Sequence, residues 1–214
     1  MSLTVGALWR YPVKSLAGEP LAEAVVAPEG IPGDRLVHVR GPEGLRTSRS
    51  RHHYRLLGLH GMTGVDGEPA IDGHPWRSAE ALALVRSAAG ADAELVRSDE
   101  QMRFDILPLL VVSDGAVAAF GRDVRRLRPN LVIAGADGLE EFGWAGHELH
   151  IGDAVIRLDS RRPRCPMTTV DPDTLERDLD VLKDINHRFD GMLALNADVT
   201  TSGTIRVGDA VRLV

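Results

Sequence analysis

Residues 147–158 have the sequence HELHIGDAVIRL, two short segments rich in apolar residues joined by Gly152 and Asp153. Glycine and aspartate between apolar runs are typical of a tight turn, so this stretch predicts a strand, a turn and a second strand. Its centre recurs near the C-terminus, where residues 207–211 have the sequence VGDAV. Two copies do not make a repeat protein. We expect the two turns to be two corners of one β-barrel.

Most of the remaining chain also predicts short strands. In the first ~60 residues, turn-forming residues recur about every ten positions, which is typical of a barrel or a sandwich. The near-continuous apolar run 106–113 predicts a buried strand. Strands are expected at 3–11, 21–27, 36–40, 54–59, 94–97, 106–113, 131–134, 147–151, 154–158, 165–170, 192–195, 204–207 and 210–214.

Three helices are expected beside these strands. Ser78 can cap a helix over 78–89, and Gly90 can end it. A short helix is expected over 114–120, and apolar residues recur at helical spacing over 173–189. The predicted fold class is therefore α+β and predominantly β, a β-barrel with short peripheral helices.

A polar break at 98–103 suggests two units. Residues 1–97 would form an N-terminal β-rich subdomain, and residues 98–214 would form the second domain. At 214 residues with 43% hydrophobic residues, the chain can bury one sizeable core or two small linked ones.

Composition and charge argue against several classes of protein. The formal net charge of −6 argues against a general nucleic-acid or anionic-membrane binder. No apolar run approaches the ~18 residues that span a bilayer, and the first residues lack the pattern of a signal peptide. The single cysteine, Cys165, excludes an intramolecular disulfide and fits a reducing compartment. The sequence therefore predicts a soluble cytoplasmic protein. The histidines are scattered and do not have the spacing of zinc ligands.

The first segment that could carry chemistry is YPVKS at 11–15, followed by Gly33, Asp34 and Arg35. Proline ends a strand, so Lys14 and Ser15 would lie at a barrel rim, where functional groups often sit. Lys14 is one of only two lysines in the chain, and with Arg35 it could face an anion. The alternative is a solvated turn, which residue types alone favour.

The second segment is RDVRRLRPN at 122–130, which places four arginines within seven residues of an acidic protein. An arginine fork donates two parallel hydrogen bonds to phosphate, and Asn130 can offer its amide to a polar ring. The alternative is a charged helix surface paired with the acidic residues Asp137, Glu140 and Glu141.

The third segment is RRPRCPMTTVDP at 161–172, where two prolines flank the only thiol. Three nearby arginines would stabilise a thiolate at Cys165, which is a nucleophile or a soft metal ligand. The alternative is a structural buried cysteine, which the flanking charge disfavours.

These segments, in this order, resemble the MOSC family, named for the C-terminal domain of molybdenum cofactor sulfurase, and the first half resembles the β-barrel domain that precedes it. The family includes the mitochondrial amidoxime reducing component and its bacterial relatives. The resemblance covers nearly the whole chain. It rests on 11–15, Asp34-Arg35, Ser113, Arg128-Pro129-Asn130, Trp144, 151–153, Arg164-Cys165, 168–172 and 203–209.

The resemblance implies a molybdenum cofactor (Mo-molybdopterin), with Cys165 as the protein ligand to the metal. Lys14, Ser15 and Arg35 match positions that touch the cofactor's phosphate and pterin. Arg128 and Asn130 match positions that hold the pterin from the other side, and Pro163 and Arg164 flank the metal ligand. Ser113 matches the family's strand-ending serine, and Met192 stands where family reductases often have an aromatic residue. The matches do not extend to Arg122, Arg125, Arg126, Arg161 or Arg162.

The implied activity is reduction of N-hydroxylated, or other N-/S-oxygenated, small molecules by oxygen-atom transfer. Electrons would come from a separate protein, a ferredoxin- or flavin-type reductase, because one cysteine cannot hold an iron–sulfur cluster. Asp171, Asp173 or a bound water would relay protons. One alternative is a molybdenum-cofactor carrier or a sulfur-transfer protein that carries a persulfide on Cys165. Another is a domain that binds a different small anionic ligand.

Overall fold

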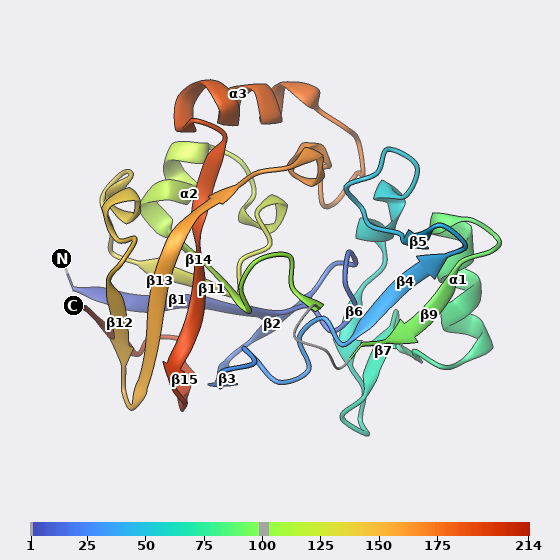
Figure 1. Cartoon of the computed structure of the whole chain (residues 1–214), viewed down its shortest axis with the longest axis horizontal. Coiled ribbons are helices and arrows are strands. Elements are labelled where there is room, and N and C mark those ends of the chain that lie inside the picture. Colours follow the sequence, from blue (N-terminus) through green and yellow to red (C-terminus); the bar gives the residue numbers. More distant parts are fainter. Residues whose placement is uncertain (1, 99–102) are drawn as a thin grey trace.

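The computed structural model describes residues 2–98 and 103–214, and its larger part is a closed β-barrel (Figure 1). Within these residues seven strands follow one another in the order β11-β10-β14-β13-β12-β16-β1, and pairing of β1 with β11 closes the ring. The barrel strands are β1 (Leu3–Arg10), β10 (Leu109–Ser113), β11 (Leu131–Ala134), β12 (Glu148–Ile151), β13 (Ala154–Pro163), β14 (Met192–Thr201) and β16 (Ala210–Leu213). The predicted barrel with short peripheral helices is thus confirmed.

Two short pieces extend the barrel. Strand β2 (Glu19–Leu21) pairs with β1, while β3 (Glu23–Val26) and β15 (Gly203–Arg206) form a separate two-stranded ribbon. Strands β10 and β11 are parallel, and the chain between them contains α2 (Asp114–Phe120). Apolar side chains from the barrel strands and from this ribbon fill one contiguous buried core.

The two Gly-Asp turns occupy different places in the barrel. Gly152, with a left-handed φ of 56°, lies in the turn of the β12–β13 hairpin, as expected. Gly208, with a φ of 93°, lies between β15 and β16, so the second turn leads from the outer ribbon into the barrel. Backbone bonds between Val5 and Gly208–Asp209 hold this second turn against β1. Only the first turn is therefore a corner between two neighbouring barrel strands.

A smaller unit lies beside the barrel, on the right in Figure 1. It has a core of its own, and the helix α1 (Ala79–Ala89) packs on this core. The unit contains two three-stranded sheets, β4 (Val37–Gly41) with β5 (Gly44–Leu45) and β9 (Glu94–Arg97), and β6 (Gly61–Thr63) with β7 (Pro69–Ile71) and β8 (His74–Pro75).

The division at residues 97 and 98 stays a prediction. Strands β1 and β2 lie in the barrel although they precede the smaller unit in the sequence. Residues 99–102, most of the polar break that suggested the boundary, lie outside the described residues.

The helices follow their capping residues. Ser78 Oγ accepts from the Ala81 N–H and Ser113 Oγ from the Ala116 N–H, so α1 and α2 begin where predicted. The third helix, α3 (Leu179–Phe189), begins at the N-cap Asp178 instead of at residue 173. Asp171 Oδ1 accepts from the N–H groups of Asp173 and Thr174, which forms a turn before the helix. None of the helices among the described residues is long and apolar enough to cross a membrane.

Two predicted strands are 3₁₀ helices. Residues 54–59 contain η1 (Tyr54–Gly58), and residues 165–170 contain η5 (Pro166–Thr169). Pro166 suits the first helical position, and the hydroxyls of Thr168 and Thr169 donate to backbone carbonyls three residues earlier. The predicted strand at 106–113 begins only at Leu109. Two further 3₁₀ helices are η3 (Val124–Arg126) and η4 (Glu140–Gly143).

Glu141 in η4 is fully buried and joins two barrel strands. Its carboxylate accepts the backbone N–H groups of Ser113, at the end of β10, and of Ala194 in β14, the latter at 3.1 Å. Removing the carboxylate leaves both donors buried without an acceptor, and each costs about 1–3 kcal/mol. We expect Glu141→Ala to lower the free energy of unfolding by about 3 kcal/mol in urea denaturation, and Glu141→Gln to lower it by less. Equal stability of Glu141→Ala and the wild type would contradict this role.

Candidate functional site

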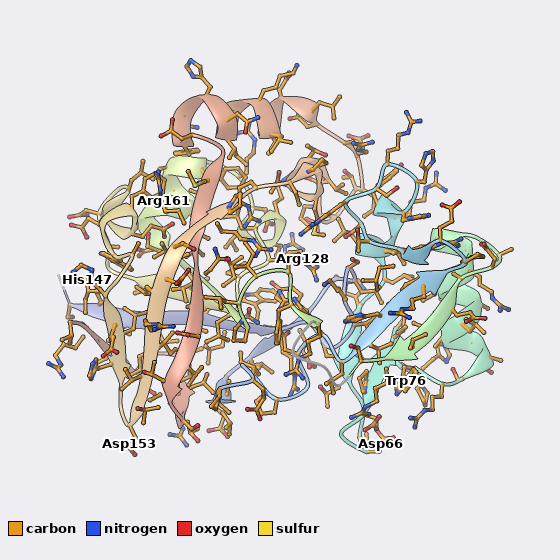
Figure 2. The ribbon with its side chains drawn as sticks, in the orientation of Figure 1. Asp66, Trp76, Arg128, His147, Asp153 and Arg161 are labelled. Carbon is orange, nitrogen blue, oxygen red and sulfur yellow. The ribbon has the colours of Figure 1, made fainter. Side chains whose placement is uncertain are left out.

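A hollow that is partly open to solvent lies between the end of the barrel and the smaller unit, and residues of both line it. The three segments singled out in the sequence converge on it from the loop after β1, the loop before β11 and the end of β13. Figure 2 shows Arg128 near this junction, in the middle of the molecule. Eight predicted site residues line the hollow: Lys14, Ser15, Arg35, Arg128, Asn130, Pro163, Arg164 and Cys165.

Three other predicted site residues do not line the hollow. Ser113 is fully buried, and its hydroxyl caps α2. Asp171 binds Arg126 Nη2 at 2.8 Å and caps the turn before α3. Met192 is half-buried and pairs with Pro163 in the β13–β14 ladder. Their assignment to the cofactor or to proton transfer stays a prediction.

The hollow also contains residues that the motifs did not indicate. Arg162 donates to Asn196 Oδ1 at 3.1 Å and binds Asp105 at 3.2 Å. Sequence proximity was an available signal, because Arg162 directly precedes Pro163 and Arg164, two predicted site residues at the end of β13. Arg161 instead stacks over the Phe142 ring at 4.8 Å. The polar, charged and aromatic lining residues that were missed are Thr47, Arg49, Phe104, Asp105, Arg162 and Asn196.

Positive charge dominates the lining. The cations are Lys14, Arg35, Arg49, Arg128, Arg162 and Arg164, against one acidic residue, Asp105, among the described lining residues. Asp105 contacts Lys14 Nζ at 3.0 Å, Arg162 and Arg49. Although burial raises the pKa of Asp105, these three cations outweigh it and lower that pKa. The surplus cations favour an anionic ligand.

Two of these arginines are cations with no carboxylate partner in the described part of the chain. Arg128 is 8% exposed, donates to the Leu16 carbonyl at 2.5 Å and lies 4.2 Å from the centre of the Tyr11 ring. Arg164 donates to the Leu127 carbonyl at 2.8 Å, while its Nε is buried without a partner. Burial lowers the pKa of each guanidinium to about 10. Because an uncompensated buried cation is costly, both side chains fit a site built for an anion.

The backbone of the hollow is also unusual. Ser15, Arg35 and Arg128 have left-handed φ values of 73°, 56° and 58°, a region that residues with a side chain rarely adopt. Such strain costs free energy and concentrates at functional sites. Three instances in one hollow therefore support a binding role.

Cys165 lies at the start of η5 with an extended backbone, and its side chain is half-buried and lines the hollow. A thiolate is a soft ligand suited to a transition metal. Among the described residues, the donor set thus combines one thiol with surplus cations and an arginine N–H that has no partner. It fits a metal-containing group that carries a phosphate.

His38 lies behind the hollow in β4, is 5% exposed, and its Nε2 lies 3.1 Å from the Arg35 carbonyl. Burial, with the nearby Lys14 charge, lowers the pKa of His38 from 6.5 to about 4. The unfolded chain therefore binds a proton between pH 6.5 and 4 that the folded chain does not, and stability falls as pH falls through this window.

We expect the loss over this window to be about 3 kcal/mol, measured by urea denaturation between pH 7 and 4. His38→Gln should flatten this part of the profile, whereas replacement of the exposed His74 should leave it unchanged. An identical slope in wild type and His38→Gln would contradict the assignment.

Comparison with known proteins bears on this geometry. Residues 112–212 match the family model described as the MOSC domain. Human mitochondrial amidoxime reducing component 2 is 26% identical, over 97% of this chain and 82% of its own length. Human mitochondrial amidoxime-reducing component 1 is 27% identical, over 99% of this chain and 83% of its own length. The resemblance to the MOSC family is therefore confirmed.

Among solved structures, the YuaD protein from Bacillus subtilis superimposes with a TM-score of 0.52 at 12% sequence identity. The superposition covers all of this chain and 96% of YuaD. At this identity the match supports the fold alone.

Proposed function

We propose that this chain binds a molybdenum cofactor in the hollow and reduces N-hydroxylated, or other N-/S-oxygenated, small molecules by oxygen-atom transfer. The observation that carries the proposal is that half-buried Cys165 shares the hollow with Arg128 and Arg164, two arginines without a carboxylate partner among the described residues. The hollow lies at the end of a barrel that resembles MOSC proteins. The similarity to two amidoxime reducing components over nearly the whole chain supports the reductase assignment.

The residues of the hollow would bind different parts of the cofactor. Cys165 would be the protein ligand to the metal. Lys14, Ser15 and Arg35 would bind phosphate and pterin from one side, and Arg128 and Arg164 would neutralise charge from the other. When bound, the cofactor supplies two-electron oxygen-atom transfer, and the protein supplies orientation and electrostatics.

The position and charge of Asp171 do not favour it as the proton relay. The N–H groups of Thr174 and Asp173 lower the pKa of Asp171, so this carboxylate is ionised at neutral pH. Asp171 also lies outside the residues that line the hollow. Water that enters through the open mouth of the hollow is therefore the better candidate for proton delivery.

Electrons would come from a separate protein of the ferredoxin- or flavin-reductase type. The single thiol fits a reducing compartment, and we place the protein in the cytoplasm as part of this proposal.

The experiment is measurement of molybdenum and released pterin per chain after production in a molybdate-supplied host that makes the cofactor. We expect close to one of each per chain, and turnover of an N-hydroxylated compound with a chemically reduced dye as electron donor. A folded protein without metal and pterin would overturn the proposal. Sulfane sulfur on Cys165 would then indicate the alternative, a sulfur-transfer protein.

A further inference from the structure

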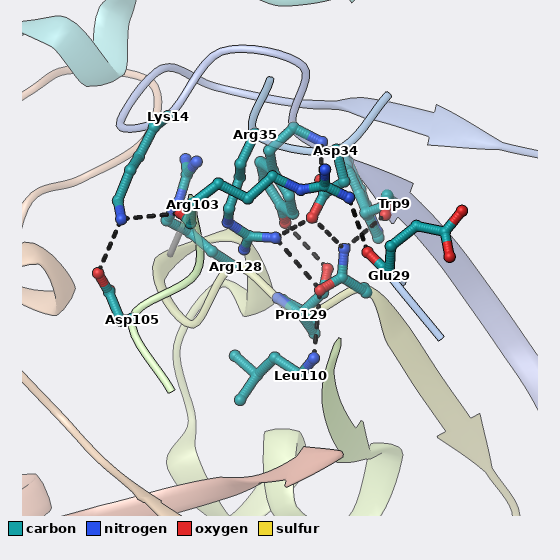
Figure 3. Close-up of polar contacts among 12 residues, drawn as sticks. Trp9, Lys14, Glu29, Asp34, Arg35, Arg103, Asp105, Leu110, Arg128 and Pro129 are labelled. Atoms are coloured by element: carbon teal, nitrogen blue, oxygen red, sulfur yellow. Dashed lines mark hydrogen bonds and ion pairs between the residues drawn. The ribbon is translucent and has the colours of Figure 1, made fainter. Parts of the chain in front are cut away.

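Asp34 is a fully buried carboxylate behind the hollow, and the proposed function leaves it without a role. It accepts the backbone N–H of Tyr11 at 2.7 Å, Arg35 Nη1, and Asn130 Nδ2 at 3.3 Å (Figure 3). It does not line the hollow, whereas Arg35 does. The charge of Asp34 is thus compensated by Arg35, and Asp34 can act on a ligand only through its neighbours.

Asn130 is fully used inside the protein. Its Oδ1 accepts from the Leu110 N–H at 3.2 Å and faces Arg35 Nη1 at 3.4 Å. Its Nδ2 donates to the Trp9 carbonyl at 3.2 Å and to Asp34 at 3.3 Å. A side-chain amide has two donors and two lone pairs, and all four are engaged here. Because Asn130 also has no exposed surface, it can bind a ligand only by giving up an existing bond.

Arg35 is held through its backbone, through Nη1 and through two aromatic rings. Its backbone N–H donates to the Tyr11 carbonyl at 2.7 Å, and its guanidinium lies 5.0 Å from the Tyr11 ring centre and 5.9 Å from that of Phe104. Nη1 is taken by Asp34 and Asn130. No hydrogen bond from Nε or Nη2 to another described residue accompanies these contacts. The Nε–Nη2 edge of the fork is therefore left for a ligand.

We propose that Asp34 and Asn130 are positioning residues that orient Arg35, so that its Nε–Nη2 edge binds an anionic group in the hollow. This inference rests on the proposed function and names how one part of that site is built. A guanidinium held in place before binding loses less conformational freedom when it forms its hydrogen bonds.

The proposal predicts that removing the Asp34 carboxylate weakens anion binding, whereas the change in charge alone would strengthen it. Removing the Asp34 carboxylate makes the region more positive, which by itself would tighten anion binding. In Asp34→Asn, however, one oxygen replaces two, so whichever way the amide turns its N–H₂ opposes either the Tyr11 N–H or Arg35 Nη1. The network that holds Arg35 would be disrupted in both cases. Anion binding should therefore weaken.

The test is a double-mutant cycle of Asp34→Asn and Arg35→Ala, with inorganic pyrophosphate as the probe and calorimetry as the measurement. The full chain is made in a host that lacks the cofactor. We expect Asp34→Asn to weaken binding about tenfold in the wild-type background, and less than about twofold when Arg35 is already alanine, because interacting residues are non-additive. Denaturation midpoints of all four proteins report structural damage separately.

The matched control is Asp198→Asn, which removes a carboxylate that binds Arg157 at 2.6 and 3.1 Å outside the hollow. It should leave pyrophosphate binding unchanged. Tighter binding in Asp34→Asn, equal weakening in both backgrounds, or no binding by the wild type would each overturn the inference. If Asp34→Asn does not fold, Asn130→Ser takes its place in the same cycle. Failure of the proposed function would show itself separately, as missing metal in protein from the cofactor-producing host.

Discussion

Cys165→Ser should lose nearly all of its molybdenum when purified from a cofactor-producing host, falling from close to one metal per chain to below about one-tenth. Sulfur is a soft ligand that is readily deprotonated, whereas a serine hydroxyl is hard and stays protonated near neutral pH. The substitution should not damage the fold. Cys165 is the N-cap of η5, a position that serine favours.

Pterin content should fall less than metal content in this variant. The surplus cations of the hollow remain in place, and under the proposed function they would bind the phosphate without help from Cys165. Metal analysis and fluorescence of released pterin on the same sample give both values. Met62→Leu, a change at a sulfur-containing residue of β6 that does not line the hollow, is the control and should keep both. Undiminished metal in Cys165→Ser would remove the cysteine from the coordination sphere.

The parts of the fold that could be predicted from the sequence are those with a local cause. Ser78 and Ser113 cap their helices through their own hydroxyls, and a glycine with left-handed φ makes the β12–β13 turn. The misassigned segments depend on contacts that hydrophobic patterning does not report. In 165–170 a proline and two threonine hydroxyls favour a 3₁₀ helix over an extended chain.

The candidate site also contains residues that could be predicted from the sequence and residues that could not. Lys14, Arg35, Arg164 and Cys165 lie in dense motifs, and closure of the barrel brings them together. Arg49 and Asp105 are single residues in loops, and only the packing of the smaller unit against the barrel places them in the hollow. Ser113 was included because it matches a position in the MOSC family. A sequence match cannot show that the Ser113 hydroxyl caps α2.

We expect Arg164→Met to lose cofactor without losing stability of the fold. Among the described residues, Arg164 has no carboxylate partner, its buried Nε has no hydrogen-bond partner, and its side chain donates one hydrogen bond, to the Leu127 carbonyl. Replacing such a cation with an apolar side chain of similar length is often neutral or stabilising. We expect the free energy of unfolding in urea to stay within about 1 kcal/mol of the wild type or to rise by about 1–2 kcal/mol.

Cofactor content of Arg164→Met should nevertheless fall about tenfold or more, because the variant would lose the proposed charge-assisted contact to the anionic group, next to the proposed metal ligand. Arg161→Met is the matched control, since Arg161 is three residues earlier and stacks on Phe142 instead of lining the hollow. It should keep its metal and pterin. Full cofactor content in Arg164→Met would show that the unpartnered arginine is not a binding group. A large loss of stability in Arg164→Met made without the cofactor would show that Arg164 stabilises the fold and does not serve a ligand.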